Sequence, residues 1–344
     1  MLTHGINYPW SVVNGRSNYG CDFGRNVWGG HSGVTAHATD VRRDFDVMAA
    51  AGIDVVRWFV FTDGRGGIQW TDDGHVAGLA EGTVEDLDEA LGIARDTGRR
   101  LCLVLFDHLW MVHREEPSTG DSVPFSTQPY ALASDVEQQR LFECVLEPLL
   151  ARYGTTGSHA GLGQVIHSID VINEPDWVTR GLSLDRSRRP GSWRARVPRP
   201  FSRHELRALV RGVADRVHAS TRMLVTVGGG RSDLIREWDD AAYGLDFIQV
   251  HLYPDTRRLA RDHAMLTGPC DALQVSKPVL IGECPANAVH QHPAGHHPAP
   301  YSLADYLDIA RNGRYLGAWA WSFTGIDDFG AVDVAGLPAL IARA

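Results

Sequence analysis

Eight short apolar runs, spaced along almost the whole chain, constrain its fold more than any other feature. Each run is too short for a helix, and stretches with helical periodicity separate the runs. This alternation is typical of βα units that build a parallel sheet, whose strands are buried on both faces. The eight predicted strands are Thr3–Tyr8, Ile53–Phe59, Leu101–Phe106, Val165–Asn173, Met223–Val227, Phe247–Leu252, Val279–Gly282 and Leu316–Ser322.

Helix-end signals lie between these runs. Gly52 and Gly98 stand where a helix should turn into the next strand. The capping-box pattern, a serine or threonine with an acidic residue three places later, predicts helix starts. It occurs at Ser134 and Ser202 and, with aspartate as the acidic partner, at Thr83 and Ser302.

Eight strands with seven or eight interleaved helices favour a closed (β/α)8 barrel over an open doubly wound sheet. A dinucleotide-binding sheet would carry GxGxxG after its first strand, and the sequence has none there. The glycines at 228–230 follow the fifth run and have the wrong spacing. We find no internal repeat or low-complexity linker. The chain is therefore predicted to be an α/β protein, a single (β/α)8 TIM-barrel domain over residues 1–344.

Four of the predicted strands are followed by long loops. All four are βα loops, which build the active face of such a barrel, and loops of this length are usually functional. We therefore expect the site at that face. The loops are Pro9–Thr39, Asp107–Ala133, Asp176–Phe201 and Cys284–Pro300.

Charge and composition narrow the partners. A net charge of −9 argues against nucleic acid or an anionic membrane as the main partner. The amino terminus lacks the pattern of a secretory signal, and no apolar stretch approaches the ~20 residues of a membrane span. The five cysteines are scattered, and Cys102 lies in an apolar run, where a buried thiol is expected. A cytoplasmic location is predicted, unless a leader has been removed; the oligomeric state stays open.

Two glutamates close apolar runs. Ile172-Asn173-Glu174-Pro175 ends the fourth run, and Ile281-Gly282-Glu283 ends the seventh. Burying an unpaired carboxylate is costly, so packing does not explain this placement. If the two strand ends converge, they supply the carboxylate pair that glycosidic bond cleavage requires.

These motifs resemble those of the clan A retaining glycoside hydrolases, most of all glycoside hydrolase family 5, which holds cellulases and mannanases. The resemblance covers most of the chain. Further matches, in the same order as in the family, are Ala51–Arg57, Asp107-His108, His251-Leu252-Tyr253 and Trp319–Ser322.

The resemblance implies a role for each matched residue. Glu174 takes the place of the acid/base and Glu283 that of the nucleophile. The other matched residues would bind substrate or brace the nucleophile: Arg57, His108, Asn173, His251, Tyr253 and Trp321.

The chemistry itself makes demands on these residues. In a retaining mechanism the carboxyls lie about 5–5.5 Å apart, and their pKa values are pushed in opposite directions. Arg57 and the Tyr253 hydroxyl would keep Glu283 anionic, whereas Glu174 would stay protonated. Asn173 is expected to bond the sugar 2-hydroxyl, and Trp321 to offer a flat face to the sugar.

Structural readings of the same residues stay open. The two glutamates could form an ion pair at the barrel mouth, and Arg57 could neutralise Asp54 or Asp63. His108, His251 and Trp321 could be packing residues. The histidines at 290–297 could chelate a metal, but the Pro, Gly and Ala around them favour a solvated loop, so no metal site is predicted. The arginine-rich stretch 180–199 is predicted to be a solvated flap.

The predicted function is therefore that of a retaining O-glycosyl hydrolase. It would cleave β-glycosidic bonds of gluco- or manno-configured oligo- or polysaccharides by double displacement, through a glycosyl-enzyme intermediate and without a cofactor. Its expected partner is carbohydrate. The alternatives are a non-catalytic carbohydrate-binding barrel and a metal-dependent barrel hydrolase, although the latter class wants His-x-His at the end of the first strand. The sugar, its linkage and endo or exo action stay open.

Overall fold

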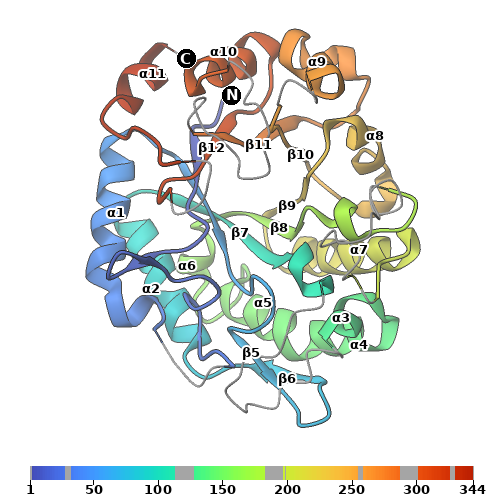
Figure 1. Cartoon of the computed structure of the whole chain (residues 1–344). Coiled ribbons are helices and arrows are strands. Elements are labelled where there is room, and N and C mark those ends of the chain that lie inside the picture. The colour runs from blue at the N-terminus through green and yellow to red at the C-terminus, as the bar shows by residue number, and fades with distance from the viewer. Residues whose placement is uncertain are drawn as a thin grey trace.

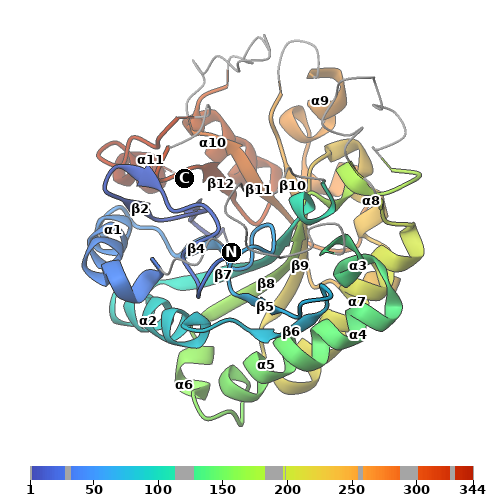
Figure 2. The ribbon, with the colours of Figure 1, turned by 60° about the horizontal axis from the view of Figure 1, so that its bottom comes forward.

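A computed structural model describes residues 2–27, 32–112, 128–182, 197, 199–254, 259–286, 301–325 and 330–343. Eight parallel strands close into a barrel, with helices outside them (Figures 1 and 2). The predicted (β/α)8 fold is confirmed, and each predicted strand overlaps one of these eight. The strands are β1 (Gly5–Asn7), β4 (Val55–Phe59), β7 (Arg100–Asp107), β8 (Ile166–Asn173), β9 (Leu224–Gly229), β10 (Ile248–His251), β11 (Val279–Pro285) and β12 (Ala318–Trp321).

Helices connect successive barrel strands. None of those described is both long and apolar enough to cross a lipid bilayer. A π-helical turn, Phe142–Leu146, joins α4 to α5. The α-helices are α1 (Ala38–Ala50), α2 (Thr83–Asp96), α3 (Gln128–Ala133), α4 (Asp135–Leu141), α5 (Glu147–Tyr153), α6 (Ala160–Gly163), α7 (Arg203–Ser220), α8 (Ile235–Trp238), α9 (Leu259–Thr267), α10 (Leu303–Gly313) and α11 (Leu337–Arg343).

The helix-end predictions are confirmed in part. Ser202 and Ser302 each form a complete capping box, and Gly52 and Gly98 take left-handed φ values of 82° and 71° after their helices. The other two positions also begin helices, as predicted, but neither forms the capping box. The backbone of Ser134 starts α4 without help from its side chain. The Thr83 hydroxyl bonds the Gly67 carbonyl because the segment before α2 folds against it.

Two antiparallel hairpins, neither of them predicted, lie in βα loops. β2 (Val12–Val13) and β3 (Arg16–Ser17) flank Asn14-Gly15, where both residues have positive φ. This is the turn chemistry that two-residue hairpins favour. β5 (Ile68–Trp70) and β6 (Val76–Leu79) form the other hairpin, after β4.

The barrel interior is layered. A lower apolar layer consists of Val55, Cys102, Phe247, Leu280 and Trp319. The predicted burial of the Cys102 thiol is thus confirmed, and all five cysteines are free. An upper layer at the mouth contains Phe59, Val104 and Trp321. Trp319 and Trp321 therefore share the inward face of β12, and polar side chains such as the fully buried Arg57 lie between the two layers.

A bulge in β11 aims Glu283 into the mouth. Val250 pairs with Ile281, but the next residue of β10, His251, pairs with Glu283 and skips Gly282. Leu280 packs inside the barrel and Ile281 outside it. Strict alternation would therefore point Glu283 outward. The extra residue returns it to the interior, as bulges near active sites do.

Candidate active site

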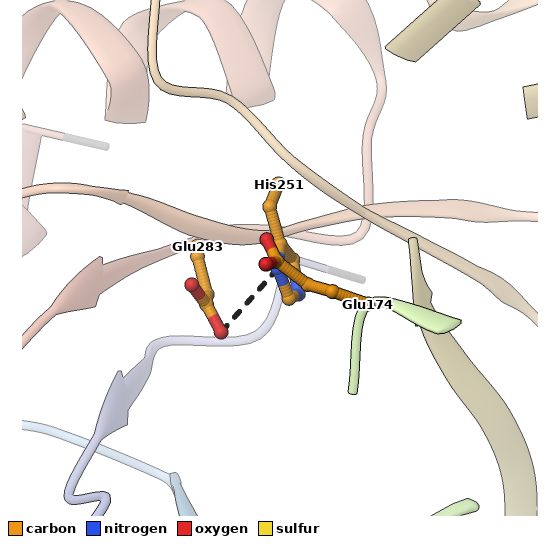
Figure 3. A group of neighbouring side chains, drawn as sticks. All are labelled: Glu174, His251 and Glu283. Atoms are coloured by element: carbon orange, nitrogen blue, oxygen red, sulfur yellow. Dashed lines mark hydrogen bonds and ion pairs between the residues drawn. The ribbon is translucent and has the colours of Figure 1, made fainter. Parts of the chain in front are cut away.

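Glu174, His251 and Glu283 converge at the carboxyl ends of β8, β10 and β11 (Figure 3). One ligand atom of each lies within 4.8 Å of the other two. His251 Nδ1 is 3.0 Å from Glu174 Oε1 and 3.4 Å from Glu283 Oε1. The structure thus brings the two sequence-predicted glutamates to one site, with a histidine between them.

The backbone at Glu174 is left-handed, with φ 51° and ψ 42°. Such a conformation is uncommon for a non-glycine residue and clusters at functional sites. The Glu174 N–H donates to the Gly228 carbonyl at 2.6 Å, and Pro175 then opens the 3₁₀ helix η4 (Pro175–Val178). Gly230 leaves room for this turn, because a methyl group there would lie 2.4 Å from Trp177 Nε1.

Glu283 is almost fully buried and is held by a cation and a phenol. Arg57 Nη1 donates to its Oε1 at 2.6 Å, and the Tyr253 hydroxyl donates to its Oε2 at 2.8 Å. Charge-assisted hydrogen bonds of this kind fix a carboxylate in place and favour its anionic form. Both predicted contacts to Glu283 are present.

Arg57 is fully buried, and its carboxylate partners are Asp170 and Glu283 rather than Asp54 or Asp63. Two of its nitrogens, Nε and Nη2, donate to Asp170 Oδ2 at 3.0 and 2.8 Å. Burial lowers the pKa of Arg57, but the two carboxylates more than offset this and raise it above its ordinary value.

Asp170 is a site residue that the sequence analysis missed. It also accepts from Gln249 Nε2 at 2.6 Å and from the Gly228 N–H at 3.0 Å. The only signal for Asp170 in the sequence was its position as an acidic residue in the middle of an apolar run.

Glu174 has neutral donors where Glu283 has a cation. Trp177 Nε1 donates to its Oε2 at 2.9 Å, and His251 Nδ1 faces its Oε1. Burial lowers the pKa of His251 to about 4, so the imidazole is neutral near pH 7. The Glu174 side chain is 19% exposed against 5% for Glu283, which gives it the readier access to solvent.

Burial raises the pKa of both glutamates. For Glu174 it outweighs the opposing effects of His108, Trp177 and Arg57, and for Glu283 those of His251, Arg57 and Tyr253. The prediction that the two pKa values shift in opposite directions is therefore wrong. Burial dominates at both positions because both side chains enter the same enclosed mouth. What differs between the two is the charge of their hydrogen-bond partners, since each glutamate has two and only Glu283 has a guanidinium.

Asn173 bridges two charged residues instead of facing the mouth freely. Its Oδ1 accepts from Arg57 Nη2 at 2.8 Å, and its Nδ2 donates to Asp107 Oδ2 at 2.7 Å. One amide hydrogen is left over from these two bonds.

His108 lies beside Asp107, with its Nδ1 3.2 Å from Asp107 Oδ1. It opens the 3₁₀ helix η2 (His108–Met111) after β7. Burial lowers the pKa of His108, but the carboxylates of Asp107, Glu174 and Asp176 raise it above the ordinary value.

Trp321 lies at the mouth, 9% exposed. Its ring meets Phe59 and Trp10 nearly at right angles, with centroids 6.0 and 6.3 Å apart. Trp10 and Trp177 were not predicted, although both follow strand ends. The histidines at 290–297 and most of the arginine-rich stretch 180–199 lie outside the described residues.

No family model matches the chain, and no curated protein matches it in sequence. Solved structures do match. The β-mannanase of the blue mussel Mytilus edulis has a TM-score of 0.71 at 19% identity, over 100% of this chain and 92% of its own. The β-1,4-D-mannanase of Cryptopygus antarcticus has a TM-score of 0.74 at 17% identity, over 98% of this chain and 90% of its own. The endo-1,4-β-mannanase of Eisenia fetida has a TM-score of 0.69 at 20% identity, over 98% of this chain and 90% of its own. This likeness shows a shared (β/α)8 fold.

Proposed function

We propose that residues 1–344 form a single catalytic domain, a retaining glycoside hydrolase that cleaves β-glycosidic bonds of gluco- or manno-configured saccharides. The observation that carries the proposal is the spacing of the glutamates, with an oxygen of Glu174 no more than 4.8 Å from an oxygen of Glu283. Retaining enzymes place their carboxyls about 5–5.5 Å apart, whereas inverting enzymes leave about 6.5–9.5 Å for a water.

The partners of each glutamate support its role. Glu283 is the nucleophile, because Arg57 and Tyr253 orient it and stabilise its charge. Glu174 is the acid/base, because its hydrogen-bond partners, Trp177 and His251, carry no formal charge to hold it as an anion.

In the first step Glu283 attacks the anomeric carbon while Glu174 gives its proton to the leaving oxygen. The glycosidic bond breaks and an ester to Glu283 forms. In the second step Glu174 takes a proton from water, which attacks the ester and releases the sugar with its original configuration. This sequence requires no cofactor.

The remaining predicted residues serve the reactive sugar. Trp321 offers an apolar face, and the second amide hydrogen of Asn173 is the donor for the 2-hydroxyl. His108 faces the substrate beside Asp107, and His251 holds Glu174. The mannanases that share the fold support a β-mannosidic substrate. So does the resemblance of the strand-end motifs to family 5.

The test is hydrolysis of aryl β-mannosides, aryl β-glucosides and β-1,4-linked oligosaccharides, with NMR of the first-formed sugar before mutarotation. A β-configured first product is expected. An α-configured one would exclude double displacement even if both glutamates proved essential. Absence of turnover on every substrate, with the fold intact, would favour the non-catalytic carbohydrate-binding alternative.

A metal-dependent hydrolase is the second candidate, since Glu174, His251 and Glu283 could each offer a ligand atom to one ion. Against it, the Arg57 guanidinium contacts Glu283 Oε1 at 2.6 Å and would repel a cation there. Dialysis against a chelator decides between the two. The glycosidase keeps its activity, whereas a metal enzyme loses it and regains it with added metal.

A further inference from the structure

We infer that Asn7 and Gln249 are positioning residues for Glu283. From opposite sides of β11 they hold the bulge at Gly282, and they tie this bulge to the buried guanidinium of Arg57. The inference rests on the proposed function, because a carboxylate has to be placed this closely only if it attacks the anomeric carbon.

The bulge interrupts the pairing of β11 with both of its neighbours. Against β10, the register skips Gly282. Against β12, two residues of β11, Gly282 and Glu283, lie opposite the single residue Trp319. A bulge leaves its extra residue unpaired and the ladder locally disrupted. The backbone at Gly282 therefore needs contacts from outside the ladder if Glu283 is to stay in one place.

Asn7 supplies such contacts from the end of β1, where its side chain is fully buried. Its Nδ2 donates to the Gly282 carbonyl at 2.9 Å. The same nitrogen lies 3.2 and 3.4 Å from the carbonyl oxygens of Ala320 and Trp319, on the strand beside the bulge. An asparagine amide has two N–H hydrogens and one oxygen, so Asn7 can hold the bulge and still accept a bond from another partner.

That partner is Arg57, whose Nη1 donates to Asn7 Oδ1 at 2.9 Å and also to Glu283. The remaining three N–H groups of Arg57 go to Asp170 and Asn173. A guanidinium has five N–H donors in a fixed fork, and here each of the five has an acceptor. Asn7 thus fixes the direction of Nη1 as well as the backbone of the bulge, which are the two sides of the contact between Arg57 and Glu283.

Gln249 contacts the bulge from β10, on the other side of β11. A β-carbon on Gly282 would lie 2.1 Å from Gln249 Cγ and 2.4 Å from its Cδ, so the glutamine fills the space that the glycine leaves. Its Nε2 donates to Asp170 Oδ2 at 2.6 Å, and the same oxygen accepts from Arg57. Because Gln249 is fully buried, its side chain links the bulge firmly to the guanidinium through Asp170.

The first measurement is kcat and KM per mole of folded enzyme, on an aryl β-glycoside that the wild-type enzyme hydrolyses. Asn7→Ala should lower kcat about 10²-fold with little change in KM, because displacing a reacting group by about 1 Å costs about that much. Gln249→Met keeps the length of the side chain but cannot donate to Asp170, and should lower kcat about tenfold.

Gln138→Met is the matched control. Gln138 is also buried, but it donates to the carbonyls of Leu132 and Glu205 among the outer helices, away from the barrel mouth. Its replacement should lower the melting temperature and leave kcat unchanged.

A second measurement separates the placing of Glu283 from general damage to the mouth. In a Glu283→Ala background with azide, the attack no longer involves the carboxylate. Adding Asn7→Ala or Gln249→Met to that background should cost little, although each lowers kcat when Glu283 is present. Gln249→Met also decides the matter if Asn7→Ala does not fold, because methionine preserves the packing against Gly282.

Equal losses with and without Glu283 would overturn the inference, since the two residues would then shape the mouth rather than place the nucleophile. A variant whose kcat is unchanged would overturn it for that residue. Both outcomes leave the proposed glycosidase intact. No turnover of any aryl β-glycoside by the wild-type enzyme would instead refute the proposed function, and the inference with it.

Discussion

The ends of β8 and β11 each place a glutamate in the barrel mouth, but the surroundings of the two glutamates differ. Glu283 is clamped between a buried guanidinium and a phenol, both within 2.8 Å. Glu174 meets an indole and a neutral imidazole and is more exposed. Burial alone therefore does not distinguish the acid from the nucleophile, because it raises the pKa of both glutamates. The charge of the partners is what separates the two roles.

The strongest test of this contrast is Glu283→Ala. We expect turnover to fall by orders of magnitude on every substrate, because no ester can form. Azide, which is small enough to fill the space left, should restore part of the activity and give a product of inverted configuration. Activity on aryl glycosides with product NMR measures both effects, and azide-independent residual turnover would contradict the nucleophile role.

Glu174→Ala should show a loss that depends on the leaving group. Poor leaving groups need a proton and should lose about 10²–10⁴-fold in the glycosylation step, whereas activated aryl groups should lose much less. A series of aryl glycosides of graded leaving-group pKa measures the dependence. A loss of activity that does not depend on the leaving-group pKa would show that Glu174 is not the acid, and would weaken the contrast between the two strand ends.

Asp170→Asn tests whether the pKa of Glu283 depends on Asp170 and Glu283 sharing the Arg57 guanidinium. Without the second carboxylate, Arg57 acts on Glu283 alone and favours its anion, so the pKa of Glu283 falls. The acid limb of the pH–activity profile should move to lower pH, with a reduced kcat and little change in KM. Breaking a buried pair costs about 3–5 kcal/mol, so the melting temperature should fall as well.

A matched control separates these two effects. Asp86→Asn removes another fully buried carboxylate, one that binds the backbone of Gly24 and Thr35. It should lower the melting temperature without moving the acid limb. If the acid limb of the pH–activity profile does not move in Asp170→Asn, the role of Asp170 is structural only.

The smallest expected effect belongs to Trp177→Phe, which removes one donor from Glu174. The indole N–H favours the carboxylate form and so lowers the pKa of Glu174. Its loss should raise that pKa further. Because the acid must be protonated, the alkaline limb of the kcat/KM profile should move to higher pH, with the acid limb unchanged. A shift to lower pH would mean that Trp177 acts through packing alone.

The fold was predictable because its signals are local and repeated. Eight apolar runs fixed the strand order, and strand ends such as Glu174 fixed where polar chemistry meets the mouth. The hairpins in the βα loops were missed because their strands span only two to four residues. Periodicity cannot be read over so few residues, although Asn14-Gly15 was a turn signal that could have been used.

Asp170 shows why the site was predictable only in part. Its partner Arg57 lies 113 residues away in sequence, and no spacing between them signals the pairing. Asn173 had the same limitation, since its sequence neighbours gave no sign that Arg57 and Asp107 would bind both ends of its amide.

Local sequence was enough to predict which side chains lie at the carboxyl ends of the strands, because alternation and strand length are local properties of the chain. What those side chains contact depends on how distant segments pack. The bulge at Gly282 turns Glu283 into the mouth, and it exists only in the pairing of β10 with β11. Likewise, the raised pKa of both glutamates comes from their removal from water, and that burial depends on the closed barrel around them.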